Sequence, residues 1–311
     1  MSRDDFPRPL TPVHGPFAPA KVAGAADGMG TYGDAARSLV DRGVVQPDLV
    51  CGMTLALISD QPAFRGPKPR ADGKVSGTDG GVWVRERFTI HRPLRVDDAW
   101  TVEGEATGVY SRKGRRYSTT VSRSADSAGR RFATNLSTGL TSYRPDPDLA
   151  DGERGVPVAE TPTPEPDGDA ASGNPHADAL AALQPGDRFG DLEVPVTLAM
   201  MAARDTKNPN NPIHSDPEAA KKAGLRRPIA GGSHVLAFAL EAVMAGVGDE
   251  VFLHGATIDA RWKAPTEDGA VIVPSAEVTA VEADAVHFDL AVELVGGPLA
   301  MVATAVVPLA R

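Results

Sequence analysis

Apolar and polar residues alternate over several short stretches of this chain. Residues 116–124 (RYSTTVSRS) and 286–294 (VHFDLAVEL) both follow this pattern. It predicts strands with one buried face, because successive side chains of a strand point to opposite sides. Residues 233–248 (SHVLAFALEAVMAGVG) are instead apolar on nearly every side of a helix. Such a helix is expected to be buried.

The two halves of the chain repeat one order of predicted elements. Each begins with a short helix that ends at a glycine, Gly43 or Gly224, as helices commonly do. An apolar helix follows, with Gly52 or Gly232 at its beginning, and the rest of each half is patterned as strands. We therefore expect an α+β fold in which each half packs one central helix against an antiparallel sheet.

The boundary between the halves is a change in composition. Residues 143–179 are rich in Pro, Asp and Gly and poor in large apolar side chains, which is typical of a linker or a long surface loop. The predicted organisation is an N-terminal domain over residues 1–145, a linker over 146–182 and a C-terminal domain over 183–311.

Charge and cysteine content exclude several classes of function. The formal net charge of −9 argues against a nucleic-acid partner, which would require a basic surface. The single cysteine, Cys51, forms no intramolecular disulfide and suits a reducing cytoplasm. The first residues do not have the pattern of a signal peptide. No run of about 20 apolar residues occurs, so no transmembrane helix is expected. No cluster of His, Cys and Asp has metal-binding spacing, so neither a metal nor a cofactor is expected.

The candidate chemistry lies in the stretch NPNNPIHSDPEAAKKAGLRRPIAGGSH, residues 208–234. His214 falls on a loop between two predicted helices, because Pro209 and Pro212 prevent helix continuation. Gly231 and Gly232 open the apolar helix, where backbone N–H groups have no intrahelical partner and can stabilise an oxyanion. A histidine facing such a helix end favours acid–base chemistry on a carbonyl compound. A structural loop histidine is the alternative.

These residues give the sequence a resemblance to the MaoC-like hydratases, the (R)-specific enoyl-CoA hydratase and 3-hydroxyacyl-thioester dehydratase group with the hotdog fold. The segments that carry it are NNPIHSD, EAAKKAG, RPIAGGS and RWKAP, in that order. The repeated halves resemble the form with two hotdog folds in one chain, which make a pseudo-dimer. The first half has no Asn-Pro-x-His motif, so the resemblance implies at most one active site per chain.

The resemblance also implies roles for individual residues. His214 becomes the catalytic histidine, Asn211 its motif neighbour and Gly232 the oxyanion donor. The family's catalytic Asp has no counterpart in this sequence, because Pro209 occupies its position. Asp205 can replace it if the residues that follow form an insertion. Two further alternatives stay open: His214 works alone through one water, or the protein performs other chemistry or only binds.

The implied activity is reversible hydration of an enoyl thioester, or dehydration of an (R)-3-hydroxyacyl thioester, carried on CoA or on a carrier protein. Substrate contacts are expected from Asn211, Gly231, Ser233, Arg227 and Lys263, the last two as cations that could meet phosphates. A homodimer of such chains is compatible with the resemblance. The rival hypotheses are a hydration-deficient hotdog protein that binds or processes a biosynthetic acyl intermediate, and an acyl thioesterase.

Overall fold

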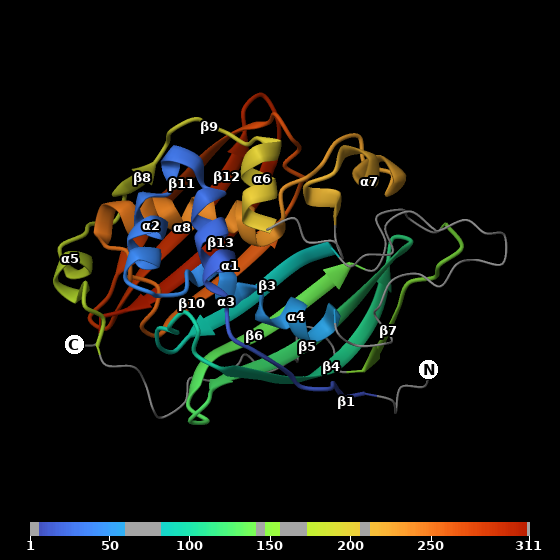
Figure 1. The fold of residues 1–311 in the computed structure, drawn as a ribbon, viewed down its shortest axis with the longest axis horizontal. Helices are drawn as coiled ribbons and strands as arrows, with labels where there is room; N and C mark the ends of the chain where they lie inside the picture. Colours follow the sequence, from blue (N-terminus) through green and yellow to red (C-terminus); the bar gives the residue numbers. More distant parts are fainter. Residues whose placement is uncertain (1–5, 60–81, 141–146, 156–172, 206–211, 310–311) are drawn as a thin grey trace.

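The computed structural model describes residues 6–59, 82–140, 147–155, 173–205 and 212–309. The N-terminal half contributes seven strands and four α-helices to these residues (Figure 1). They are β1 (Arg8–Pro9), β2 (Val13–Gly15), α1 (Pro19–Asp27), the 3₁₀ turn η2 (Gly30–Tyr32), α2 (Asp34–Asp41), α3 (Pro47–Cys51), α4 (Met53–Ser59), β3 (Val82–Ile90), β4 (Trp100–Arg112), β5 (Arg115–Asp126), β6 (Arg131–Leu140) and β7 (Gly152–Gly155).

The C-terminal half repeats this order after a short helix. Its elements are α5 (Ala177–Ala181), β8 (Arg188–Gly190), β9 (Val194–Pro195), α6 (Leu198–Asp205), the 3₁₀ turn η3 (Pro212–His214), α7 (Pro217–Lys222), α8 (Gly232–Val247), β10 (Ala256–Trp262), β11 (Val271–Val281), β12 (Ala285–Leu294) and β13 (Leu299–Pro308). None of the described helices is long and apolar enough to cross a membrane.

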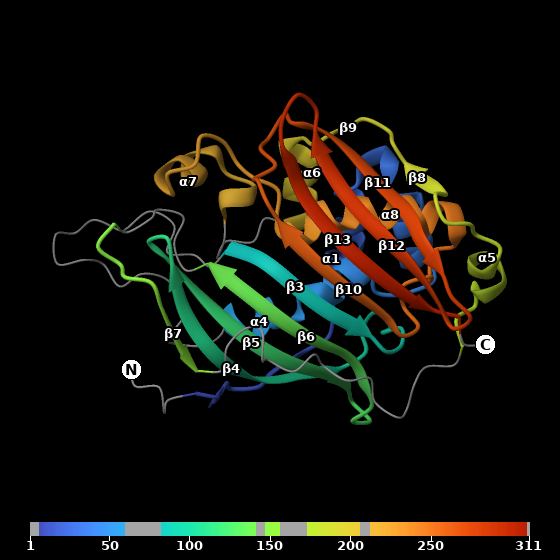
Figure 2. The same cartoon turned by 180° about the vertical axis from the view of Figure 1, so that it is seen from behind.

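All described strands join one antiparallel sheet in the order β1-β4-β5-β6-β3-β10-β13-β12-β11-β8, with β2, β7 and β9 at its margins. The halves meet where β3 pairs with β10, from Ala256 opposite Ile90 to Arg261 opposite Arg85. The larger helices lie on one side of the sheet in Figure 1, and the view from behind in Figure 2 shows the strands in front. The fold is therefore α+β, as the sequence predicts, with two helix-on-sheet units side by side.

The central helix of the C-terminal half is buried as predicted. Residues 234–244 of α8 are all buried, and the sheet face beneath the helix is apolar, with Ile258, Val278, Phe288 and Met301 nearly inaccessible to solvent. An all-round apolar helix has no polar face to present to water, so burial is the stable arrangement.

The prediction of one long apolar helix in the N-terminal half is wrong. The helix is interrupted at Gly52, which separates α3 from α4. The Asn135 side chain of β6 donates a hydrogen bond of 3.3 Å to the Cys51 carbonyl oxygen just before the interruption. Asn135 also donates to the buried Glu86 carboxylate at 3.0 Å. A polar side chain from the sheet therefore satisfies backbone that a continuous helix would have used internally.

Parts of the predicted linker are ordered against the sheet and the helices. The strand β7 pairs with β4, and α5 follows within the same segment. His176 lies so close to Gly248 that a Cβ on the glycine would be 2.2 Å from the imidazole ring. Gly248 also has a φ of +150°, which side chains rarely adopt. The linker thus ends in a fixed contact with the turn after α8.

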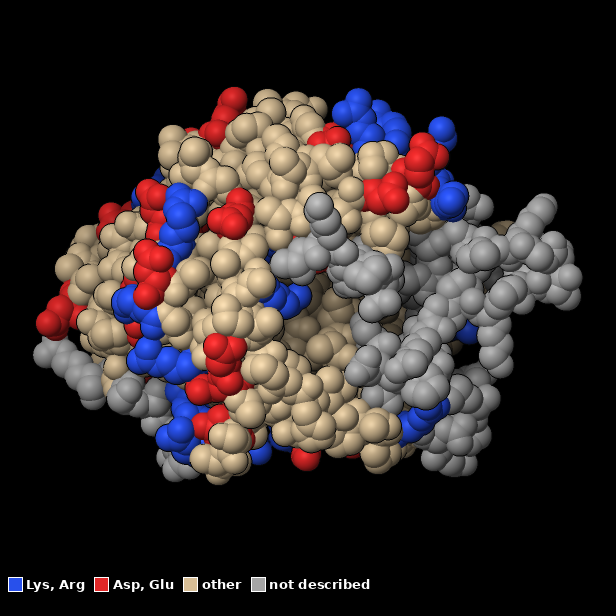
Figure 3. All heavy atoms as spheres, viewed as in Figure 1, with Lys and Arg blue, Asp and Glu red and all other residues tan. Residues whose placement is uncertain are grey.

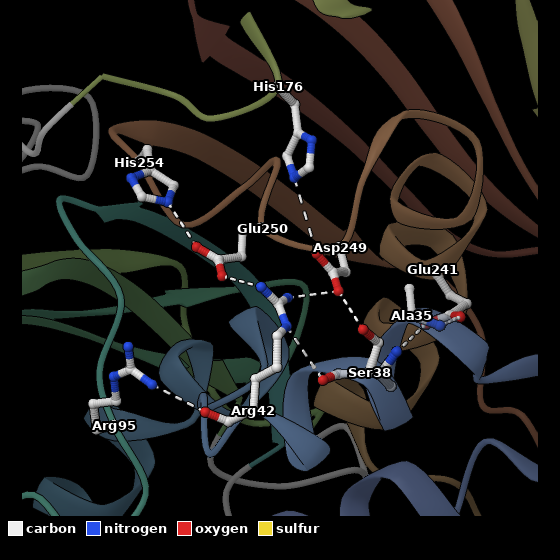
Figure 4. Close-up of polar contacts among 10 residues, drawn as sticks. Ala35, Ser38, Arg42, Arg95, His176, Glu241, Asp249, Glu250 and His254 are labelled. Atoms are coloured by element: carbon white, nitrogen blue, oxygen red, sulfur yellow. Dashed lines mark hydrogen bonds and ion pairs between the residues drawn. The ribbon is translucent and has the colours of Figure 1, made fainter. Parts of the chain in front are cut away.

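A charged cluster joins the two halves at the end of α8 (Figure 4). Arg42, the C-cap residue of α2, forms ion pairs of 2.5 Å with both Asp249 and Glu250 of the C-terminal half. Ser38 donates a hydrogen bond of 2.5 Å to Asp249, and His254 contacts Glu250 at 3.0 Å. The Asp249 and Glu250 side chains are 19% and 18% exposed, whereas the Arg42 side chain is 43% exposed, so water partly screens these pairs.

The buried Glu241 of α8 caps a helix of the other half. Its two carboxylate oxygens accept hydrogen bonds from the Ala35 and Ala36 N–H groups at 2.6 and 3.1 Å, at the first turn of α2. The α2 helix has no capping side chain of its own, so Glu241 supplies the missing acceptors. Burial raises the pKa of Glu241 to about 7, although the two N–H donors oppose this shift.

We expect Glu241→Gln to gain stability relative to the wild type as the pH rises. The pKa of Glu241 is higher in the folded chain than in the unfolded chain, so its contribution is complete below about pH 4.5 and is lost as the pH passes about 7. At about 1.4 kcal/mol per pKa unit, the relative change in the free energy of unfolding should approach 3 kcal/mol. Urea unfolding of both proteins at pH 5 and pH 8 measures it; a difference that is the same at both pH values would contradict the shift.

Candidate active site

A cavity of about 730 Å³ lies between the two halves. Its walls come from α1, α3, α4 and β3 of the N-terminal half and from α6, η3, the beginning of α8 and the end of β10 of the C-terminal half. Figure 3 shows a hollow near the middle of the molecule, between the two helix-bearing units. Its size is in the range that binds small organic ligands.

His214 ends the 3₁₀ turn η3 and faces this cavity. Its Nδ1 lies 2.7 Å from the Ile229 carbonyl oxygen. A carbonyl can only accept, so Nδ1 carries the proton of the neutral ring and Nε2 is the basic nitrogen. The Nε2 side of the ring is directed toward Gly231, where a Cβ built on the glycine would lie 4.0 Å from Nε2. The basic nitrogen is therefore aimed at the beginning of α8.

The following helix α7 fixes the other side of this loop. Asp216 is its N-cap and accepts hydrogen bonds from the N–H groups of Glu218 and Ala219, and Pro217 occupies the first helical position, where proline is favoured. The helix ends before Gly224, whose φ of +84° suits glycine. The stop at Gly224 agrees with the sequence prediction, and the cap and the stop together hold His214 at the end of a short connection.

Gly232 is the first residue of α8 and lies beneath two stacked indoles. Trp83 of β3 and Trp262 of β10 have ring centroids 5.5 Å apart, and the Trp262 Nε1 donates to the Gly232 carbonyl at 2.9 Å. A Cβ on Gly232 would lie 3.0 Å from Trp262 and 3.1 Å from Trp83. A side chain at this position would require the indoles to shift by a few tenths of an ångström. As the first helical residue, Gly232 directs its N–H away from the helix, where it can donate to a ligand.

Asp205 is the last residue of α6, and one of its carboxylate oxygens, Oδ2, is buried. It lines the same cavity as His214 and Gly232. Its neighbour Arg204 forms a buried ion pair with Asp48 of α3, with side chains only 6% and 3% exposed. This pair fixes the end of α6 to the N-terminal half. The fold therefore brings the predicted replacement acid to the cavity that holds the predicted base.

His234 is the second histidine in the cavity wall, and its contacts are structural. Its Nε2 lies 2.8 Å from the Gly28 carbonyl oxygen at the end of α1, and its ring stacks on Phe238. Burial, reinforced by Arg204, lowers the pKa of His234 well below its ordinary value. The ring is therefore neutral and donates a hydrogen bond from Nε2 to the Gly28 carbonyl oxygen, so His234 is a packed, hydrogen-bonded residue.

The other residues named from the sequence are distributed as follows. Gly231, Ser233 and Lys263 line the cavity. Arg227 is outside the lining and donates to the Asp268 carbonyl oxygen at 3.1 Å on the surface. Asn211 and Pro209 lie outside the described residues. Sequence reasoning missed the contribution of the N-terminal half, whose side chains Phe17, Lys21, Asp48, Trp83, Trp100 and Tyr117 also line the cavity.

The N-terminal half has no matching site at the equivalent position. Val45 N–H bonds to the Leu94 carbonyl just as Ala230 N–H bonds to the Thr266 carbonyl, so Pro47 is the counterpart of Gly232. Proline has no N–H to donate. The sequence comparison of Gly52 with Gly232 is thus wrong, because it ignored this register. The corresponding 3₁₀ turn ends in Tyr32 where η3 ends in His214, so both the base and the donor are absent there.

No group of three or more His, Cys, Asp or Glu side chains with metal-binding geometry exists within the described segments. The chemistry that this geometry permits is proton transfer by His214 and Asp205 next to a backbone N–H donor. The cavity is lined by both apolar and charged side chains, as small-molecule sites usually are.

Comparisons with known proteins agree with this fold. Residues 185–291 match the MaoC like domain. A search of curated protein sequences found no significant match. Among solved structures, a MaoC-like dehydratase aligns at 19% identity over 98% of this chain and 99% of that chain, with a TM-score of 0.70.

Two further structures share the architecture. A conserved hypothetical protein from Mycobacterium tuberculosis, described as having a double hotdog fold, aligns at 14% identity over 99% and 98% of the two chains, with a TM-score of 0.62. The peroxisomal multifunctional enzyme type 2 from Drosophila melanogaster aligns at 17% identity over 96% of this chain and 48% of that chain, with a TM-score of 0.64. At these identities the likeness shows the fold, which is the predicted pair of hotdog units.

We expect Gly232→Ala to be much less stable than Gly231→Ala. A methyl group on Gly232 would push into both indoles, an overpacking that typically costs about 1–3 kcal/mol. A methyl group on Gly231 has only ordinary contacts, and the φ and ψ of −62° and 150° accept alanine. Thermal unfolding of the two variants measures the difference. Equal melting temperatures would contradict the packing described for Gly232.

Proposed function

We propose that the protein catalyses reversible hydration of an enoyl thioester to a 3-hydroxyacyl thioester of (R) configuration, because residues 185–291 match the MaoC like domain. The observation that carries the proposal is the convergence of His214, Asp205 and the first residue of α8 on one cavity. Each supplies a function that the reaction needs: a base, a second polar group for the water, and a donor for the developing oxyanion.

In the hydration direction, water attacks the β-carbon of the enoyl thioester. His214 takes one proton of the water at Nε2, because the Ile229 carbonyl holds the other ring nitrogen protonated. Asp205 accepts the second O–H of the same water and orients it. The new C–O bond displaces the π electrons toward the thioester carbonyl, whose oxygen becomes negative and is stabilised by the Gly232 N–H.

The reaction is completed by proton return. The imidazolium of His214 delivers its proton to the α-carbon, the carbonyl re-forms, and both side chains are restored to their starting states. Dehydration runs through the same steps in reverse. Because the N–H donor is part of a packed helix and the indoles restrain Gly232, little reorganisation is needed as the charge develops.

The cavity is consistent with an acyl thioester as the substrate. Apolar and aromatic side chains of the N-terminal half, including Phe17, Met53 and Trp100, extend it beyond the reacting groups and could bury an acyl chain. Lys263 lies at the end of β10 in the cavity wall, where its cation could meet a phosphate of CoA or of a carrier-protein arm.

We expect His214→Ala to lower kcat for hydration of crotonyl-CoA or a longer enoyl-CoA by about 10²–10⁴-fold, the usual contribution of a general acid–base. The half-buried side chain contributes little to packing, so the melting temperature should change little. Loss of the conjugated enoyl absorbance measures the rate. Turnover equal to that of the wild type would exclude His214 as the base.

Asp205→Asn should lower kcat by about 10²-fold or more, because the amide cannot accept as a carboxylate does when it orients the water. A thiol reagent in the same assay detects any free CoA. Thiol release without hydration would contradict the proposal in favour of a thioesterase. If the wild type hydrated none of the enoyl-CoA substrates, whatever their chain length, hydratase activity on CoA thioesters would be contradicted.

A further inference from the structure

Arg204, in the last turn of α6, reaches from the C-terminal half into the N-terminal half. Its side chain donates one hydrogen bond to the Asp48 carboxylate of α3 and another, of 3.4 Å, to the Ala25 carbonyl oxygen of α1. The two acceptors belong to one unit, because the Gln46 side chain at the beginning of α3 donates to the Val22 carbonyl oxygen of α1 at 3.0 Å. The cation therefore binds to acceptors whose relative positions the N-terminal half has already set.

Close packing holds the same point of α6. Gly28, at the end of α1, lies so near that a Cβ there would be 2.5 Å from the Arg204 Cβ and 2.9 Å from the Met200 carbonyl oxygen. The Gly28 carbonyl in turn accepts a hydrogen bond of 2.8 Å from His234 of α8. The helices α1, α3, α6 and α8 thus meet around Arg204, and the end of α6 is fixed relative to the N-terminal half.

A buried ion pair is an unusual means of joining two helices. The Arg204 and Asp48 side chains are 6% and 3% exposed, so both charges have lost most of their hydration. Apolar side chains of similar volume often stabilise such a contact equally well or better. The pair also lines the cavity, together with Asp205, the residue that follows Arg204. This location beside a proposed reacting group suits a supporting contact that holds such a group in place.

We propose that the Arg204–Asp48 pair has a positioning role in the reaction: a carboxylate of the N-terminal half fixes, through Arg204, the helix end that carries Asp205 in the cavity wall. Arg204 and Asp48 act through the backbone of α6, so neither has to touch the substrate. The inference rests on the proposed role of Asp205. A displacement of about 1 Å in a reacting group can lower a rate about 100-fold, so a looser end of α6 would lower kcat even in a well-folded protein.

Replacing the whole pair by apolar residues separates this role from a structural one. Asp48→Leu combined with Arg204→Met removes both charges and leaves neither unpaired, so the melting temperature should equal or exceed that of the wild type. We expect kcat for enoyl-CoA hydration to fall at least about tenfold, with KM changed less than about twofold. In the Asp205→Asn background the same double change should cause no further loss, because residues that act through one group are not additive.

Two further variants accompany this one. Arg204→Lys keeps a cation opposite Asp48 and should retain more of kcat than the apolar double variant does. Arg42→Met is the matched control, because Arg42 also forms ion pairs across the halves, with Asp249 and Glu250, but is not among the described residues that line the cavity. Its melting temperature should fall slightly, since the two carboxylates lose this cation, while kcat should stay unchanged.

Several results would overturn the inference. Wild-type kcat in the stable apolar double variant would show that the pair serves the fold alone. A rise in KM larger than the fall in kcat would make the two side chains substrate contacts. A loss that adds to that of Asp205→Asn would show that the pair does not act through Asp205. An equal loss of kcat in Arg42→Met would show that any loosening of the two halves has this effect.

The inference stays testable if the apolar double variant does not fold. Asp48→Asn, which keeps the volume and one acceptor, then takes its place, and an unchanged kcat in that variant would overturn the inference in the same way. The outcome is also separable from that of the proposed function. An inactive His214→Ala beside a fully active double variant would exclude only the role of the pair, whereas an active His214→Ala would exclude the proposed function itself.

Discussion

The pairing of β3 with β10 is the constraint on which the rest of the structure depends. Backbone hydrogen bonds along this pair make one sheet from two halves, and the larger helices of both halves lie on the same side of that sheet (Figure 1). Helices on one side of a continuous sheet pack against one another, and α1 meets α6 while α3 meets α8. The cavity is the space that this packing leaves between the halves, and neither half encloses it alone.

The asymmetry of the halves follows from their shared use of this space. The C-terminal sheet presents an apolar face to a continuous helix. The N-terminal sheet presents buried polar groups, Glu86 and Asn135 among them, to a helix interrupted at Gly52. Burial raises the pKa of Glu86 to about 7, and its hydrogen-bond partners only partly offset this shift. The N-terminal half holds no base and no oxyanion donor. It can therefore contain buried polar groups and an interrupted helix, provided that it still forms its wall of the cavity.

Local chemistry explains what could be predicted from the sequence. Alternation, apolar periodicity, glycine stops and the prolines at 209 and 212 are properties of neighbouring residues, and they identified the α+β fold, the buried α8 and the loop that carries His214. The contribution of Lys21, Asp48 and Trp83 to the cavity depends on contacts across more than a hundred residues, which no local pattern encodes. The comparison of Gly52 with Gly232 failed for a related reason. Equal spacing from a helix stop does not establish equal hydrogen-bond register, and Pro47 holds that register in the N-terminal half.

The contact between His176 and Gly248 has a consequence for how the protein behaves on dilution. In a dimer of two separate hotdog chains, the cavity would exist only while the subunits stay associated, so its integrity would depend on protein concentration. Here the connecting segment runs from one half to the other and ends docked on the turn after α8, which keeps the halves at a high effective concentration. The cavity is consequently formed within a single molecule, and its integrity does not depend on the concentration of the protein.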